Sequence, residues 1–228
     1  MKMKKFVALL LAFSGFLLSA CNGGEEPAEI SEYTADGFVD PNTGVEYVTA
    51  RGGRTLYAVT AGEKYLTAAD TAFYTVEFEE KSKFLCLPDN GENLLYRAKD
   101  VEEPDVVSFE PVSAGIYNSG NARKMAQLYA DDEYLPDELK GRNPSQDTAL
   151  CRELARAVAE NEQSDCEDDE IDSSTLRFVR LYSQKYPGLY YLLAVYGDTY
   201  GRYFVRDRYL GKSVICPREI SVRIYGKG

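Results

Sequence analysis

The chain has 228 residues, with 37 Asp and Glu against 26 Lys and Arg, a formal net charge of −11 and no histidine. The absence of histidine excludes Ser-His-Asp and Cys-His catalysis and histidine metal ligation, and the acidic balance disfavours nucleic acid as a partner. A chain of this length can bury one sizeable core.

The N-terminus predicts a secretory leader. Lys2, Lys4 and Lys5 precede the apolar run 6–20, and a positive flank before a short hydrophobic stretch is typical of a signal peptide. A membrane-spanning helix needs about 20 apolar residues, so this run is too short to cross a bilayer. We therefore expect residues 1–20 to be removed.

The end of this leader, Leu18-Ser19-Ala20-Cys21, resembles the lipobox of bacterial lipoproteins. The resemblance implies that Cys21 carries acyl chains, palmitate among them, and that a lipid membrane is a partner of the chain. Several acyl chains make a durable anchor. Asn22 follows the cysteine, and in this family a residue other than Asp there favours the outer membrane, with the domain facing the periplasm or the cell surface.

Residues 21–44 predict a flexible, lipid-anchored tether, because they are acidic, poor in aliphatic side chains and contain Pro27 and Pro41. No Pro-rich or Gly/Ser-rich linker interrupts the rest of the chain. We expect a single globular domain over residues 45–228.

The first half of this domain is rich in β-forming runs. They are separated by Gly53, Gly62 and the Pro88-Asp89-Asn90-Gly91 turn, and they cover residues 45–49, 55–60, 72–78, 83–87 and 94–99. Short runs bounded by turn residues predict antiparallel strands.

The middle of the chain predicts two helices. In the first, Asn121 is the expected cap and Met125, Leu128 and Tyr129 share one face. The second follows Pro144, and its apolar residues recur at spacings of three and four, with Cys151 on the buried side: Leu150, Cys151, Leu154, Ala157 and Val158.

Strands are expected again at 176–184, 189–196 and 202–206, and a last one at 219–224, where Ile220, Val222 and Ile224 alternate with polar residues. The expected fold class is therefore α+β, an antiparallel β-rich single domain with two helices inserted in the middle of the chain.

Four cysteines remain besides Cys21, and an even number in an exported protein predicts two disulfides. We expect Cys151 to pair with Cys166 and Cys86 with Cys216, although three connectivities are open. No Cys-x-x-Cys pair exists, so we expect no metal and no cofactor.

The C-terminal third combines basic and aromatic residues, with ten Lys and Arg against three Asp and Glu over residues 177–227. Tyr and Arg together are typical of binding surfaces, although tyrosines also fill half-buried sheets. If the domain has a binding site, we expect it on the sheet that carries Arg202, Tyr203, Arg206 and Arg223.

These patterns favour a non-enzymatic, envelope-anchored binding or interaction module, with a glycan, a peptide or an envelope protein as partner. No catalytic residue stands out. Two alternatives remain open. The first is an exported hydrolase that cleaves a glycan with two carboxylates, one of which must have a raised pKa. The second is an assembly subunit of a surface structure.

Overall fold

The computed structural model describes residues 27–34, 36–49, 56–121, 123–129, 150–164, 170–207 and 211–225, and strands dominate it. The N-terminal half contains β1 (Ala28–Glu29), β2 (Tyr33–Thr34), β3 (Gly37–Val39), β4 (Glu46–Thr49), β5 (Leu56–Ala58), β6 (Ala61–Ala68), β7 (Thr71–Val76), β8 (Phe84–Asp89) and β9 (Glu92–Ala98). The C-terminal half contains β10 (Pro111–Tyr117), β11 (Lys124–Tyr129), α2 (Leu150–Glu160), β12 (Ile171–Ser183), β13 (Leu189–Asp198), β14 (Tyr203–Asp207), β15 (Lys212–Ile215) and α3 (Arg218–Tyr225).

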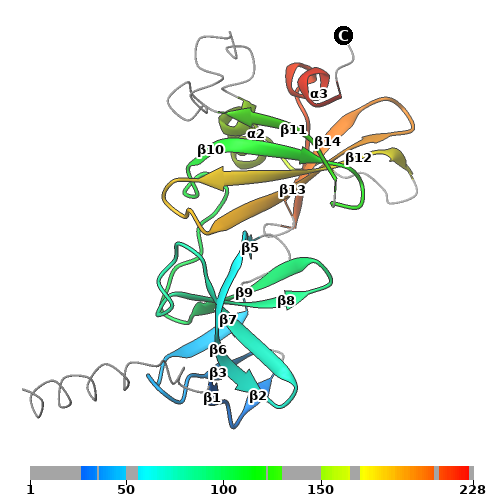
Figure 1. The fold of residues 1–228 in the computed structure, drawn as a ribbon. Coiled ribbons are helices and arrows are strands. Elements are labelled where there is room, and N and C mark those ends of the chain that lie inside the picture. The colour runs from blue at the N-terminus through cyan, green and yellow to red at the C-terminus, as the bar shows by residue number, and fades with distance from the viewer. Residues whose placement is uncertain are drawn as a thin grey trace, which may run out of the picture.

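One hydrogen-bonded sheet system connects the two halves, in the order β1-β6-β7-β8-β9-β5-β13-β12-β10-β11. Strands β4, β3 and β2 branch from β9, and β14 and β15 branch from β13. The sheet is mixed, because β1 runs parallel to β6 while the other paired strands are antiparallel. The short strand β5 is the junction: it pairs with β9 of the N-terminal half and with β13 of the C-terminal half (Figure 1).

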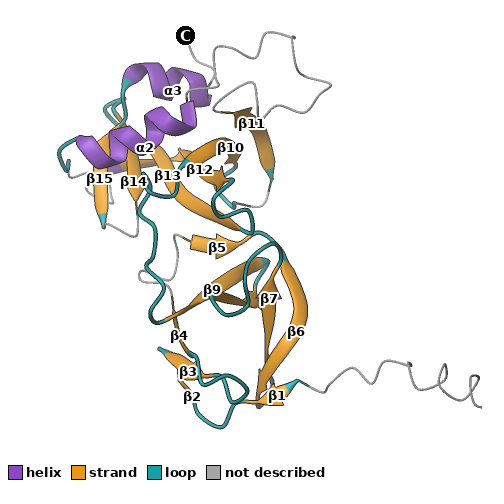
Figure 2. Ribbon diagram, turned by 90° about the vertical axis from the view of Figure 1, so that its left-hand side faces the viewer, coloured by secondary structure: helices purple, strands orange, loops and turns teal. Residues whose placement is uncertain are grey.

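Both helices cover the same face of the C-terminal sheet (Figure 2). Leu154 and Val158 of α2 and Ile220 of α3 pack into a core with Val179 of β12 and Leu193 of β13. The same core continues into the N-terminal half through residues such as Phe84 and Leu95, while a second, aromatic core around Phe38, Phe73 and Tyr96 lies within that half.

The predicted fold class, an antiparallel α+β domain with two helices in the middle of the chain, is wrong: the structure is a strand-dominated mixed sheet, and one of its two described helices lies elsewhere. Only α2 lies in the middle of the described chain, and α3 lies at its C-terminal end. The helix expected after Asn121 is instead strand β11, which pairs with β10. Asn121 has φ +53° and belongs to the turn between these strands, and Asn is one of the few residues that tolerate this conformation.

The strand expected at 219–224 is helix α3. Its buried residues Ile220, Ser221 and Ile224 follow helical spacing, and the carbonyl of Pro217 accepts hydrogen bonds from the amides of Ile220 and Ser221. Proline is favoured where a helix begins because its fixed φ suits the first turn.

The other expected elements are confirmed. The five N-terminal runs correspond to β4, β5, β7, β8 and β9, the second helix is α2, and the runs at 176–184, 189–196 and 202–206 are β12, β13 and β14. Strands β1, β2 and β3 lie within the stretch for which a tether is expected, and Phe38 of β3 is buried. The leader 1–20 and Cys21 lie outside the described residues.

The expected bridge between Cys86 and Cys216 is absent, since both carry free, buried thiols. Cys86 lies on β8, where its thiol donates to the carbonyl of Thr75 on β7, and Cys216 lies between β15 and α3, where its thiol donates to the carbonyl of Pro217. The two cysteines therefore belong to different halves of the sheet. Cys151 is buried in α2, and its expected partner Cys166 is outside the described residues.

Candidate anion-binding cleft

A cleft of about 400 Å³ lies between the exposed side of α2 and the neighbouring ends of β10 and β12. Three segments line it: the loop and strand start at Val107, Glu110, Pro111 and Val112, helix residues Arg152, Ala155 and Arg156, and Gln184 with Lys185 after β12. We call this site the α2 cleft.

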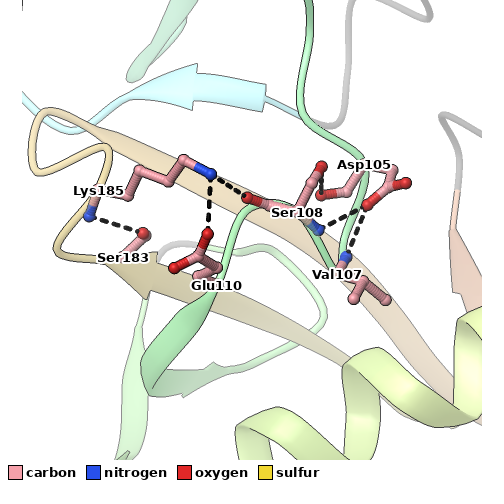
Figure 3. A network of polar contacts seen from close by, with 6 residues as sticks. All are labelled: Asp105, Val107, Ser108, Glu110, Ser183 and Lys185. Carbon is pink, nitrogen blue, oxygen red and sulfur yellow. Dashed lines mark hydrogen bonds and ion pairs between the residues drawn. The ribbon is translucent and has the colours of Figure 1, made fainter.

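Lys185 is held at the edge of the cleft by a polar network (Figure 3). Its Nζ donates to Glu110 Oε1 at 2.8 Å and to the Ser108 carbonyl at 3.3 Å, and its backbone amide donates to Ser183 Oγ at 3.0 Å. The hydrogen bond to Glu110 raises the pKa of Lys185. The lysine is therefore a fixed cation.

Asp105 orders the loop that brings Val107 to the cleft. Its Oδ1 accepts hydrogen bonds from the amides of Val107 at 2.9 Å and Ser108 at 2.7 Å (Figure 3). These backbone donors, that of Ser108 first, lower the pKa of Asp105. Val107 is 48% exposed although it is apolar, so the loop presents an aliphatic side chain to the cleft.

Helix α2 supplies two more cations. Arg152 and Arg156 are one turn apart on its exposed side, while Cys151, Leu154 and Val158 are buried. Like charges at this spacing repel each other on a helix. Within the described part of the chain, Arg156 makes no hydrogen bond or ion pair. Its guanidinium is available to an anion.

Among the described residues, the lining of the α2 cleft has three cations and one carboxylate, Glu110, which forms an ion pair with Lys185. This positive site lies in a chain of net charge −11. The rest of the described wall is aliphatic, from Val107, Pro111, Val112 and Ala155, and none of the described lining residues is aromatic. The site suits a ligand that combines carboxylate or phosphate groups with an apolar group.

The structure does not bring the four predicted binding residues together. Arg202 and Tyr203 line a separate groove of about 470 Å³ beside α3, but Arg202 donates to Asp198 Oδ2 at 2.5 Å. Arg206 is exposed and follows Val205, which faces the helices, so Arg206 lies on the opposite face of the sheet. Arg223 is on α3 rather than on the sheet, and it forms an ion pair with Glu153 of α2.

Tyrosine and arginine do meet on the sheet face away from the helices, at Arg180 of β12. Its guanidinium lies between the rings of Tyr117, 4.2 Å away, and Tyr190, 4.6 Å away. It also donates to Asn121 Oδ1 at 3.0 Å and to the Asn121 carbonyl at 2.7 Å, and the Asn121 side-chain amide donates to Glu92 of β9. The Arg180 guanidinium is therefore already engaged. Through Asn121 it links β12 of the C-terminal half to Glu92 of the N-terminal half.

The carboxylates that a hydrolase would need gather elsewhere. Glu63, Glu77 and Glu79 line an open groove with Phe78 and Lys81 beside the β7–β8 turn. Desolvation raises the pKa of Glu79. Its Oε1, however, accepts a hydrogen bond from the Gly188 amide at 3.0 Å, which gives this carboxylate a structural role.

No protein-family model, curated protein or solved structure matches the chain. In the part of the chain that the structure describes, no helix has the length and apolarity to cross a membrane. The same residues contain no cluster of three or more metal-ligating side chains.

Composition alone did not point to the α2 cleft. Residues 129–172 hold fifteen Asp and Glu against four Lys and Arg, so the segment is acidic as a whole, and Arg152 and Arg156 are two of those four. Their helical spacing, on the polar side of the predicted stripe, is the signal that would have identified them.

Proposed function

We propose that the chain is an envelope-anchored, non-enzymatic binding protein whose α2 cleft takes an acidic peptide segment of a partner protein. The observation that carries the proposal is Arg156, an exposed arginine without a described partner, next to Arg152 and Lys185 in a cleft with an aliphatic wall. Clustered cations attract carboxylates and raise their local concentration.

The wall of the cleft favours a peptide over a glycan. The described wall offers aliphatic contacts for an apolar side chain, from Val107, Pro111, Val112 and Ala155. None of the described lining residues has an aromatic ring, the group that commonly stacks on sugars. Among the described lining residues, Glu110 is the one carboxylate, and it is paired with Lys185, whereas glycoside hydrolysis uses two carboxylates.

Anchoring through Cys21 remains part of the proposal and is supported by the lipobox-like sequence. The first described strand, β1, begins at Ala28. A tether from Cys21 to β1 would be a few residues long, so the domain would lie close to the membrane surface, where other anchored proteins present their segments.

Isothermal titration with the tetrapeptide acetyl-Glu-Leu-Glu-Glu-amide tests the proposal, using the full chain in mild detergent. We expect binding that weakens as salt is added, because the contacts are solvent-exposed charges. Arg156→Glu should weaken it about tenfold or more, equivalent to about 1.4 kcal/mol. Arg218→Glu, the matched charge reversal on α3, should leave it unchanged.

A peptide with Gln in place of each Glu should not bind. Absence of binding by the acidic peptide, or equal binding by the Arg156→Glu variant, would contradict the proposal. Oligogalacturonate provides the comparison for a carboxylated glycan: if it binds through Arg156 while the peptide does not, the peptide class is wrong.

A further inference from the structure

The turn between β7 and β8 presents Phe78 to solvent. This side chain is 76% exposed, the highest value among the large hydrophobic residues that the structure describes. Its φ is +67°, a conformation that bulky residues rarely adopt. Neighbouring acidic residues flank the ring on both sides along the chain: Glu77, Glu79 and Glu80.

Hydrogen bonds hold this turn in place. The Glu77 amide donates to the Thr60 carbonyl at 3.2 Å, and the Glu79 amide donates to the Val76 carbonyl at 3.1 Å. Glu79 in turn accepts from the Gly188 amide. An exposed aromatic ring on a fixed turn loses little freedom when it binds, so the turn is preorganised for a contact.

We propose that the occupant of the α2 cleft is the β7–β8 turn of a second copy of this chain. The inference rests on the proposed function, because it names the partner of the same site. The turn offers the Phe78 ring next to the Glu77 carboxylate, while Glu79 and Glu80 are bound to Gly188 and Lys83. The cleft offers an aliphatic wall beside the cations Arg152, Arg156 and Lys185. Its volume of about 400 Å³ leaves room for a phenyl ring and a neighbouring carboxylate.

The two patches adjoin one element of the fold. The β12–β13 turn contributes Gln184 and Lys185 to the cleft, and its Gly188 binds Glu79 of the β7–β8 turn. Neighbouring patches of complementary chemistry on one molecule allow a two-fold dimer, in which the turn of each copy enters the cleft of the other. Each copy then contributes Phe78 to the site of its partner.

Sedimentation equilibrium of the full chain in mild detergent, over a range of concentrations, tests the proposal. We expect wild-type dimers whose dissociation constant rises with salt. Phe78→Ser and the double variant Arg152→Glu/Arg156→Glu should each raise this constant at least tenfold. Phe78→Leu should retain most of the association because it keeps an apolar group at the position.

Two controls separate the contact from general effects of charge or hydrophobicity. Tyr200→Ser removes another exposed aromatic ring, 73% exposed, and Arg218→Glu reverses a charge outside the cleft; both should form dimers like the wild type. Mixing Phe78→Ser chains with Arg152→Glu/Arg156→Glu chains restores one intact turn opposite one intact cleft. The mixture should therefore form heterodimers that neither variant forms alone.

The outcomes distinguish this inference from the proposed function. A wild-type chain that stays monomeric while Arg156 still binds the acidic tetrapeptide overturns the dimer and leaves the binding cleft standing. A dimer that survives Phe78→Ser places the contact elsewhere and also overturns the inference. If the chain is monomeric and does not bind the peptide, both proposals fail. Circular dichroism of each variant checks that it remains folded.

Discussion

Glu79 accepts a hydrogen bond from the backbone amide of Gly188, with 3.0 Å between Oε1 and the nitrogen. This bond joins the β7–β8 turn of the N-terminal half to the β12–β13 turn of the C-terminal half. The approach is so close that a Cβ atom at Gly188 would lie 2.3 Å from the Glu77 carbonyl oxygen. The two turns therefore meet backbone against backbone, and this contact fixes the position of the β7–β8 turn, which carries Phe78, against the β12–β13 turn.

Gly188→Ala should destabilise the fold by about 1–3 kcal/mol, because the added methyl group has to displace backbone rather than a flexible side chain. Urea unfolding followed by circular dichroism measures the change. The control is Gly120→Ala, where the nearest atom to the new Cβ would be 3.9 Å away. A Gly188→Ala variant as stable as the control would show that the turns can separate freely.

Glu79→Gln should become more stable relative to the wild type as pH rises. Desolvation raises the Glu79 pKa above its ordinary value of 4.5, so the folded state binds the proton more tightly than the unfolded state. The stability that this group contributes is therefore fully present below pH 4.5 and is lost as pH rises through the folded pKa. Glutamine stays neutral and can still accept the Gly188 hydrogen bond.

The measurement for this variant is the difference in unfolding free energy between Glu79→Gln and wild type at a series of pH values from about 4 to 7. Taking the difference removes the contribution of the other carboxyl groups. A difference that stays constant with pH would show that Glu79 titrates normally. A wild type that gains stability relative to the variant would reverse the sign of the inference.

Arg180→Lys should cost about 1–3 kcal/mol although it preserves the charge. Lysine cannot reproduce the planar fork that donates to both Asn121 oxygens while it lies between two tyrosine rings. Thermal or urea unfolding gives the value, and Arg218→Lys at an exposed position is the matched comparison. Equal stability of the two variants would mean that the arginine geometry at position 180 is dispensable.

Cys86 and Cys216 should resist alkylation in the folded protein. Both thiols are buried, and desolvation raises the pKa of each to about 12, so neither the access nor the thiolate that alkylation requires is available at pH 8. N-ethylmaleimide labelling with mass spectrometry should modify them only after unfolding. The control is Glu219→Cys, which places a thiol at an exposed position and should react at once. Labelling of Cys86 in the folded protein would contradict its buried placement.

Local patterns predicted the strands well where each one was long or bounded by clear turns, as with β13 and the β8–β9 hairpin. They failed at residues 219–224, because Ile220 and Ile224 satisfy both an alternating and a helical period over such a short run. Pro217 was the signal that favours the helix. At Asn121 a capping preference was mistaken for a helix start, whereas the pairing of β11 with β10 determines the structure.

The candidate site was less predictable than the fold. Its three cations come from α2 and from the turn after β12, and only the sheet order brings these segments together. The predicted association of tyrosine with arginine does occur: Arg202 lies over the ring of Tyr200, and the closest contacts are those of Arg180 with Tyr117 and Tyr190. Strand alternation could have placed Arg180 and Tyr182 on one face; it could not have supplied Tyr117 from a distant strand.

Strand β5 has a consequence for how the chain folds. Its partners on β13 lie more than half of the chain further along the sequence, and a contact between such distant segments forms slowly because a long loop has to close first. As the chain emerges from its N-terminus, β5 has an open edge until residues 189–191 arrive. Folding of the junction is therefore delayed until most of the polypeptide is present, and a chain cut short before β13 would carry an unpaired strand edge prone to aggregation.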